Sequence, residues 1–279
     1  EFRRVLFRSG GEGRDPSNSF RMRVTALSSG SRGNSVLVEG ASGSLLVDAG
    51  LSARDLLQRI AATGADPGAI QAVLVTHEHT DHVRGLDALA KRLDLPVYGT
   101  PGTLAEFLLH RKSTRRPVDT CPVRGDAQFT IGEFSIEPLP LSHDAREPCG
   151  YLIEAGGVRL GYCTDTGVVP GGVRERLACC DALVLEANHC PRMLEEGPYP
   201  AMLKRRIRSR RGHLSNEQTA ELLRSFSGDL AAVMLAHLSE TNNTPERARS
   251  AVEEAFGLFS SELQLSIALQ QTISRPMVI

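Results

Sequence analysis

The sequence predicts a mixed α/β fold in which helices cover internal β-sheets. Short apolar runs rich in β-branched residues recur along the chain, and segments with the apolar spacing of a helix lie between them. The first of these runs follow one another at hairpin spacing. Strands and helices mixed in this way favour sheets as inner layers beneath helical outer layers.

The expected strands are short and mostly apolar. They lie at Val24–Leu27, Val36–Val38, Leu45–Val47, Ala72–Val75, Phe129–Ile136, Tyr151–Ile153, Val158–Tyr162, Ala182–Leu185 and Ala232–Leu235. Hydrophobic residues make up 41% of the 279 residues, which is enough to build one sizeable core. Because no internal repeat or linker interrupts residues 22–279, we expect them to form one domain.

The expected helices show one apolar face or a start signal. Helical patterns occur at Ala53–Thr63, Arg84–Leu93, Thr103–His110 and Tyr199–Ile207. Ser215 and Gln218 have the spacing of a capping box, which predicts a helix from there through Phe226. Thr244 before Pro245 is typical of a helix that begins with proline at its first position.

Composition narrows the class of protein. No run of 18 apolar residues occurs, so no membrane-spanning helix is expected, and the net charge of −1 does not indicate a nucleic-acid binder by itself. The six cysteines form no C-x-x-C pair and have irregular spacing, which favours reduced thiols and a cytoplasmic location. Residues 1–21 contain the string RRVLFRS, which resembles translated vector sequence. We expect that leader to be non-native or disordered.

The strongest chemical signal is an apolar strand that runs into four potential metal ligands within six residues. These are His77, His79, Asp81 and His82, in the order H-x-H-x-D-H. A single histidine is usually a core or surface residue, but imidazole and carboxylate groups at this density are typical of a zinc-type site.

The H-x-H-x-D-H string resembles the signature of the metallo-β-lactamase superfamily. The resemblance implies a four-layer αβ/βα sandwich, and it implies further site residues at the ends of later and earlier strands. Asp48, His143, Asp165 and His237 occur in the implied order, and each follows an apolar run. Together these positions extend the resemblance over most of the chain.

The resemblance also implies roles for these residues. One divalent ion would be held by His77, His79 and His143, the other by Asp81, His82 and His237, with Asp165 as the bridge. Asp48 would orient the ligand loop rather than bind metal. The candidate catalytic residues are Asp48, Asp81 and His213. Such a pair of ions activates a shared water molecule for hydrolysis. Zn²⁺ suits this donor set best, and Mn²⁺ or Fe²⁺ also fit.

Two basic clusters indicate a nucleic-acid substrate. Residues 204–211 hold six basic side chains in eight positions, including Arg205 and Arg206, and end just before His213. A second cluster comprises Arg111, Lys112, Arg115 and Arg116. Although a charge run is usually a solvated face, these clusters can follow a phosphate backbone. We therefore expect Arg205 and Arg206 to contact substrate.

Four local strings resemble the bacterial YycJ/WalJ subfamily. They are residues 28–35, 185–194, 212–216 and 238–243. The resemblance implies a cytoplasmic 5′→3′ exonuclease acting on DNA. Cys190 departs from the pattern, since an acidic residue is expected there in this subfamily.

Three polar residues outside the seven expected ligands are candidates for substrate chemistry. His213 follows the basic run, and a protonated imidazole there can donate a proton to the leaving oxygen of a phosphodiester. Asn34, in the Gly/Ser-rich loop 28–35, and Asn243, shortly after His237, are expected substrate contacts.

Several alternatives remain open at this point. A metal-dependent nuclease is the leading interpretation, and an RNA-processing or cyclic-phosphate phosphodiesterase is the second. A glyoxalase-II-like thioesterase, which shares the H-x-H-x-D-H string, is a further alternative. A thioesterase does not need the basic run at 204–211. A metal-binding regulatory module without turnover is the non-enzymatic alternative, although it need not retain every ligand. The oligomeric state is also open.

Overall fold

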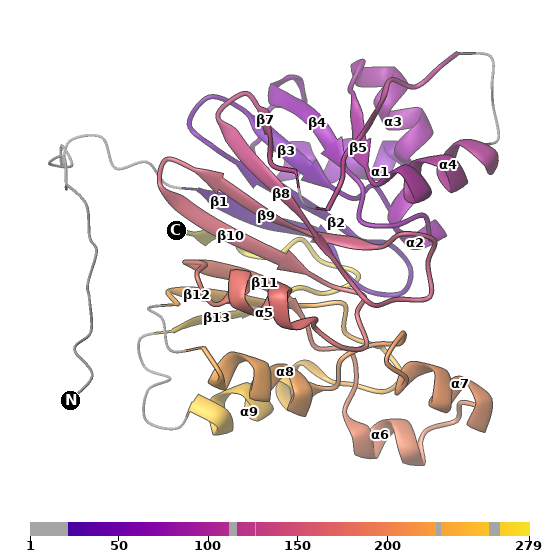
Figure 1. The fold of residues 1–279 in the computed structure, drawn as a ribbon, viewed down its shortest axis with the longest axis vertical. Coiled ribbons are helices and arrows are strands. Elements are labelled where there is room, and N and C mark those ends of the chain that lie inside the picture. The colour runs from indigo at the N-terminus through magenta and orange to yellow at the C-terminus, as the bar shows by residue number, and fades with distance from the viewer. Residues whose placement is uncertain (1–21, 112–115, 126, 227–229, 257–262) are drawn as a thin grey trace, which may run out of the picture.

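The computed structural model describes residues 22–111, 116–125, 127–226, 230–256 and 263–279, and Figure 1 shows its four layers. The predictions for the leader 1–21, Lys112 and Arg115 lie outside these residues. Two seven-stranded sheets form the inner layers, and helices cover the outer face of each. The predicted mixed fold and its sandwich arrangement are thus confirmed.

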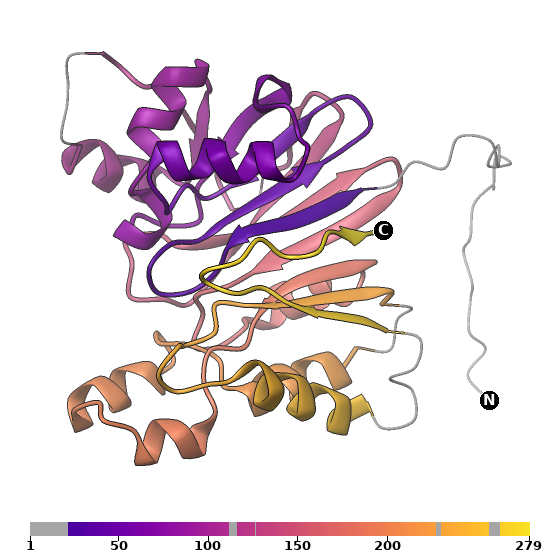
Figure 2. The same cartoon turned by 180° about the vertical axis from the view of Figure 1, so that it is seen from behind.

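The first sheet comes mainly from the N-terminal half. Its order is β14-β1-β2-β3-β4-β5-β6, with bounds Met277–Val278, Arg23–Ser28, Ser35–Glu39, Ser44–Val47, Ile70–Leu74, Val97–Gly99 and Thr120–Pro122. Its helices are α1 (Ala53–Ala62), α2 (Thr80–Val83), α3 (Leu86–Leu93) and α4 (Pro101–Leu109), with a 3₁₀ turn η1 at Pro67–Ala69. Strand β14 pairs antiparallel with β1, so the last described strand forms one edge of this sheet (Figure 2).

The second sheet comes from the C-terminal half. Its order is β13-β12-β11-β10-β9-β8-β7, with bounds Gln264–Ile267, Ala232–Ala236, Ala182–Glu186, Val158–Cys163, Cys149–Ala155, Phe134–Pro140 and Phe129–Ile131. Its helices are α5 (Gly171–Leu177), α6 (Pro191–Glu196), α7 (Ala201–Ile207), α8 (Asn216–Arg224) and α9 (Pro245–Phe256).

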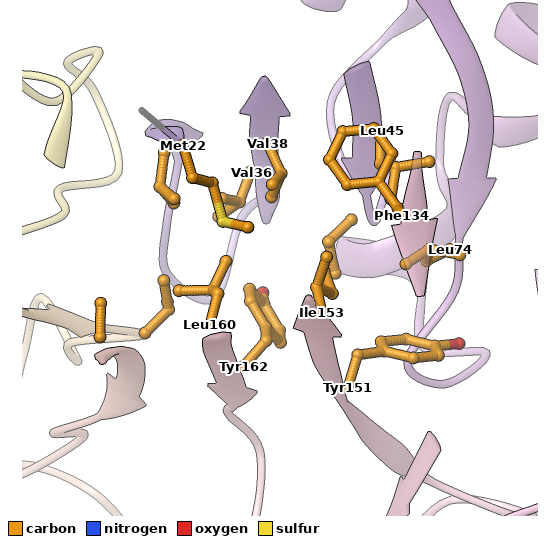
Figure 3. Close-up of a cluster of buried hydrophobic side chains, with 14 of the residues drawn as sticks. Met22, Val36, Val38, Leu45, Leu74, Phe134, Tyr151, Ile153, Leu160 and Tyr162 are labelled. Carbon is orange, nitrogen blue, oxygen red and sulfur yellow. The ribbon is translucent and has the colours of Figure 1, made fainter. Parts of the chain in front are cut away.

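The side chains of each inner strand alternate between two hydrophobic cores. On β3, Leu45 and Val47 face the opposite sheet, whereas Leu46 faces the helices. Figure 3 shows the core between the sheets, where Tyr151 and Tyr162 of the second sheet lie across from side chains of the first. Strands buried on both faces read as continuous apolar runs, which explains why they were predictable.

One predicted strand is wrong in its extent. The run Phe129–Ile136 forms two strands, β7 and β8, because Gly132 turns the chain with a φ of 55°. Ile131 and Phe134 then pair across the turn. A two-residue hairpin of this kind is hidden in an otherwise apolar run.

The topology directs several strand ends to one edge of the sandwich. Strands β3 and β4 run parallel, and so do β10, β11 and β12. Ligand-binding residues of such sheets collect beyond the carboxyl ends of the strands. In the described parts of the chain, no helix has the length and apolar character needed to cross a membrane.

Candidate metal centre

The first group of site residues follows β4. His77 lies just beyond the strand, His79 is the N-cap residue of α2, and the short helix itself carries Asp81 and His82. Backbone bonds fix the turn, since the amides of His82 and Val83 both donate to the carbonyl of His79. The turn therefore aims several side chains at one place within a few residues.

Three further site residues stand directly beyond strand ends in left-handed backbone. Asp48 follows β3 with φ 61°, Asp165 follows β10 with φ 58°, and His237 follows β12 with φ 55°. Aspartate and histidine adopt this conformation more often than most residues. His143 lies in the loop after β8, and its Nδ1–H donates to the carbonyl of Gly212 at 3.1 Å.

The structure brings all seven expected ligands together. Nitrogen and oxygen atoms within 4.8 Å of one another come from His77, His79 and His143 in one group, and from Asp81, His82 and His237 in another. Asp165 lies between them, because it groups with His77 and His82 on one side and with His237 on the other. Glu186 and His213 also group with Asp165 and His237, so the groups overlap. The assignment of the seven residues to two neighbouring ions, which the resemblance implies, stays a prediction.

Asp48 lies behind the centre and contacts its residues rather than solvent. Its carboxylate is fully buried and lies 2.8 Å from His82 Nδ1. The backbone amide of Thr76 donates to the other carboxylate oxygen at 2.9 Å. Asp48 therefore holds the ring of His82 in one orientation, as expected for a residue that positions a ligand.

The buried charges are arranged to hold cations. Burial alone would lower the pKa of His82, but Asp48 and Asp165 raise that pKa well above its usual value. Burial also opposes protonation of His237, yet Asp165 and its neighbours raise the pKa of His237 to about 10. The pKa of His77 is instead lowered, first by burial and then by the adjacent His82. A field that retains protons on buried imidazoles equally favours metal ions.

Buried polar atoms without hydrogen-bond partners also indicate that these residues fit a metal ion. Among the described side chains, Asp165 Oδ2 and His237 Nε2 are buried without a hydrogen-bond partner. Four imidazoles pack closely, and His77 Nε2 lies 3.0 Å from His79 Nδ1. Buried polar atoms normally have partners, so these atoms point to ligands that bind there.

One carboxylate beside the centre, that of Glu186, was not among the site residues predicted from the sequence. Glu186 ends β11 and is fully buried. Its Oε1 accepts from His213 Nδ1 at 2.7 Å and lies 3.2 Å from His237 Nδ1, and its Oε2 accepts from the amide of Leu214 at 3.1 Å. Burial opposes the charge of Glu186, but His213 and His237 together lower its pKa. The sequence feature that could have identified Glu186 is an acidic residue at the end of an apolar strand, which Asp48 shares.

His213 stands at the rim of the centre. Its ring lies 5.0 Å from that of His143 and 5.2 Å from that of His237, and its side chain is 19% exposed. Since Nδ1 is held by Glu186, Nε2 is the nitrogen that remains for another partner. The seven expected ligands are thus joined by one accessible imidazole outside their set.

The two asparagines expected to contact substrate are instead buried in the protein. Asn34 Nδ2 lies 3.1 Å from Asp81 Oδ2 and 3.0 Å from His82 Nε2, while its Oδ1 accepts from the amide of Gly30. Asn243 exchanges hydrogen bonds with Asn216 at 2.8 and 2.9 Å and also donates to Ala187. Their amides hold loops around the centre, so neither is placed to meet a substrate directly.

The Gly/Ser-rich loop does not form a phosphate cradle from its backbone amides. Those of Ser29, Gly30, Arg32, Gly33 and Asn34 all donate within the protein. The hydrogen bonds of these amides therefore hold the loop against the rest of the protein beside the centre.

Several arginines of the basic run, residues 204–211, already form ion pairs or hydrogen bonds within the protein. Arg206 pairs with Asp144 at 2.5 Å, Arg208 pairs with Glu195, and Arg211 donates to the carbonyl of His143. Within the described residues, no ion pair involves Arg205 or Arg210, and both are exposed. In the second cluster, Arg111 pairs with Asp87 and Arg116 with Asp94.

The fold and this His/Asp centre define a class of metal-dependent hydrolases. A model of the beta-lactamase superfamily domain matches residues 44–238. The exodeoxyribonuclease YycJ of Bacillus anthracis is 36% identical over 245 residues, which cover 85% of this chain and 92% of the relative. The exodeoxyribonuclease WalJ of Streptococcus pneumoniae is 34% identical over 232 residues, with 81% and 85% covered.

A solved structure supports the fold independently. The metallo-β-lactamase fold protein YhfI of Bacillus subtilis has a TM-score of 0.70 at 19% identity, covering 93% of this chain and 100% of that one. The chain therefore belongs to the beta-lactamase superfamily, and within it to the family of YycJ and WalJ. The metallo-β-lactamase fold implies divalent metals, and the His/Asp cluster described above could hold them.

Proposed function

We propose that the chain is an exodeoxyribonuclease that removes nucleotides from the 5′ end of DNA. The observation that carries the proposal is the position of His213, an accessible imidazole held by Glu186 at the rim of a multi-ligand His/Asp centre. A phosphodiester needs both charge neutralisation and a proton for its leaving oxygen. The curated relatives named exodeoxyribonucleases support the same reading.

The donor set fits two divalent ions. His77, His79 and His143 would hold one, Asp81, His82 and His237 the other, with Asp165 between them. Zn²⁺ accepts this mixture of imidazole and carboxylate, and Mn²⁺ or Fe²⁺ are the alternatives. When bound, such ions activate water as a nucleophile and neutralise charge on the phosphoryl oxygens.

The protein's own residues carry the other parts of the reaction. His213 donates a proton from Nε2 to the leaving oxygen, while its Nδ1–H remains hydrogen-bonded to Glu186. Glu186 fixes the orientation of the ring through this hydrogen bond. Asp48 keeps the ring of His82 fixed through the 2.8 Å contact. Arg205, on α7, and Arg210, between α7 and His213, are exposed and contact the DNA backbone beyond the site.

A substrate panel tests the proposal. The purified protein receives Mn²⁺ or Zn²⁺ and is offered end-labelled duplex DNA, single-stranded DNA, RNA and a thioester in parallel. We expect metal-dependent shortening of DNA from its 5′ end, and loss of that activity in Asp165→Ala. Preferential cleavage of RNA or of the thioester would overturn the assignment to DNA. We further propose a cytoplasmic location, since all six cysteines are free thiols.

A further inference from the structure

A hollow of about 270 Å³ opens beside the candidate centre, next to His213. Its wall includes Ser31 of the Gly/Ser-rich loop, Ser239 just after His237, and residues of α7 with the segment before it. Asp144, Asn188, Gly212 and His213 complete the lining. Figure 1 shows α6 and α7 standing out from the sandwich, and Figure 2 shows the same helices from behind. The hollow is smaller than the roughly 300–1,000 Å³ of pockets for drug-sized ligands, which suits a single flat group.

Tyr199 lines this hollow and differs from the other tyrosines of the chain. Of the four, Tyr151 and Tyr162 are buried in the core between the sheets, and Tyr98 stacks on a neighbouring phenylalanine at 5.2 Å. Tyr199 is half-buried, and among the described residues its ring has no stacking partner. An aromatic side chain beside a reactive imidazole is the kind of surface on which a nucleobase stacks.

The charges in the wall disfavour a phosphate in this place. Asp144 lines the hollow, and its carboxylate is neutralised by Arg206, whose Nε and a terminal nitrogen both lie 2.5 Å from Oδ2. Leu203 and Ile207 add apolar surface from α7. A wall with one balanced ion pair, apolar side chains and an aromatic ring fits an uncharged base better than an anion.

We propose that the hollow binds the base of the nucleotide that carries the leaving 3′-oxygen, with Tyr199 as its stacking surface. This inference rests on the proposed function, and it specifies which nucleotide the site recognises. Water oxygen forms the new bond to phosphorus and gives up a proton to the solvent, the P–O3′ bond breaks, and O3′ takes a proton from His213, which the solvent then replaces. The nucleotide released with O3′ therefore lies on the side of His213, where the hollow is. In cleavage from a 5′ end it is the terminal nucleotide.

A double-mutant cycle between the protein and the DNA tests this contact. Single-stranded DNA labelled at its 3′ end carries either a normal or an abasic residue at the 5′ terminus, and kcat/KM is measured for the first cleavage. Tyr199→Leu removes the π face but keeps apolar bulk, and Tyr199→Phe keeps the ring. Met202→Ala, which truncates an exposed side chain of the adjacent helix α7 outside the hollow, is the matched control.

For normal DNA we expect Tyr199→Leu to lower kcat/KM by about 5- to 150-fold, the range found for loss of base stacking on an aromatic side chain. Tyr199→Phe and Met202→Ala should behave like the wild type. With the abasic terminus, wild type and Tyr199→Leu should be equally slow, because the partner of the ring is already missing. An abasic residue placed six nucleotides further along should have no such effect.

Two results would overturn the inference, and they are distinguishable from each other. If wild type and Tyr199→Leu lose the same factor on the abasic substrate, the two changes are independent and the base lies elsewhere. If wild-type protein with metal cleaves no DNA at all, the proposed function fails and this subsite with it. Thermal melting of each variant shows whether a loss comes from misfolding. If the leucine variant does not fold, the wild-type protein on normal and abasic 5′ termini still tests the contact, since equal kcat/KM on the two would overturn it.

Discussion

At the scale of single residues, the centre depends on strands that end in an unfavourable backbone conformation. Asp48, Asp165 and His237 all have φ values between 55° and 61°, and they come from three different strands. A left-handed residue other than glycine costs about 1 kcal/mol or more. The packed sheets supply the stability that holds these ends, and each end turns its side chain toward the same point.

The role of His213 can be separated from metal binding by the choice of leaving group. His213→Ala should keep its metal and lose about 10²–10⁴ in rate on DNA, because a positioned acid contributes that much. The loss should be smaller on a nitrophenyl phosphodiester, whose leaving group departs without a proton. Rates on both substrates and the metal content by elemental analysis are the measurements.

The control for this prediction is His110→Ala, since His110 is a largely exposed histidine at the C-cap of α4 and belongs to none of the ligand groups. It should leave both rates unchanged. Equal losses on the two substrates with metal retained would make His213 a phosphate-binding group rather than an acid. No loss on either substrate would leave it without a catalytic role.

Much of the centre could be predicted because its ligands follow apolar strands in a recognisable order. His77 and His82 belong to a local string, and local strings are visible without a structure. Glu186 was not predicted to act, because its partner His213 is 27 residues away and many strands end in an acidic residue. Asn34 was expected at the substrate, but only the folded loop reveals that its amide turns inward to Asp81.

At the scale of elements, the short helix α8 anchors the segment that carries His213. Ser215 caps the helix, its hydroxyl accepting from the amide of Gln218 while the side chain of Gln218 accepts from the amide of Ser215. The capping box was readable from sequence because both partners lie within one turn. The hairpin at Gly132 was not, since a glycine inside an apolar run does not show whether the strand bends or ends.

Ser215→Ala tests the cap. The substitution removes one side-chain acceptor and should lower stability by about 1 kcal/mol. For a protein of this size, that corresponds to a fall in melting temperature of roughly 2–4 °C. Thermal unfolding followed by circular dichroism measures it, and an unchanged melting temperature would show that water replaces the hydroxyl without loss.

The end of α7 and the segment after it provide a test of DNA binding. Arg205→Gln with Arg210→Gln removes two exposed cations that have no ion-pair partner among the described residues, so it should weaken binding to duplex DNA. The slope of log K against log salt should become less steep by roughly 2, since each phosphate contact contributes about 0.9. Binding is measured in EDTA, which prevents cleavage.

Arg208→Gln is the matched control, because this guanidinium already pairs with Glu195. It should change the slope less than either free arginine does. If the double variant keeps the wild-type slope, the basic run is a solvated face and DNA follows another path.

At the scale of the whole molecule, the centre joins the two halves of the sandwich. His77, Asp81 and His82 belong to the first sheet and its loops, whereas Asp165 and His237 follow strands of the second. Metal bound there would link the halves at the edge where the core between the sheets ends. The same residues leave buried charges facing each other when no cation lies between them, and such charges oppose folding.

Metal should therefore stabilise the whole fold, and not only the loops that bind it. A ligand that binds the native state about 1,000-fold above its Kd adds about 4 kcal/mol. At roughly 2–4 °C for each kcal/mol, chelation should lower the melting temperature by on the order of 10 °C, and re-addition of Zn²⁺ or Mn²⁺ should restore it. Asp165→Ala, which loses the group between the two ligand sets, should show a smaller difference between metal-loaded and chelated protein. Scanning calorimetry measures the melting temperatures, and elemental analysis gives the metal content of each sample. Equal melting temperatures at full and zero metal content would mean that bound metal does not stabilise the fold.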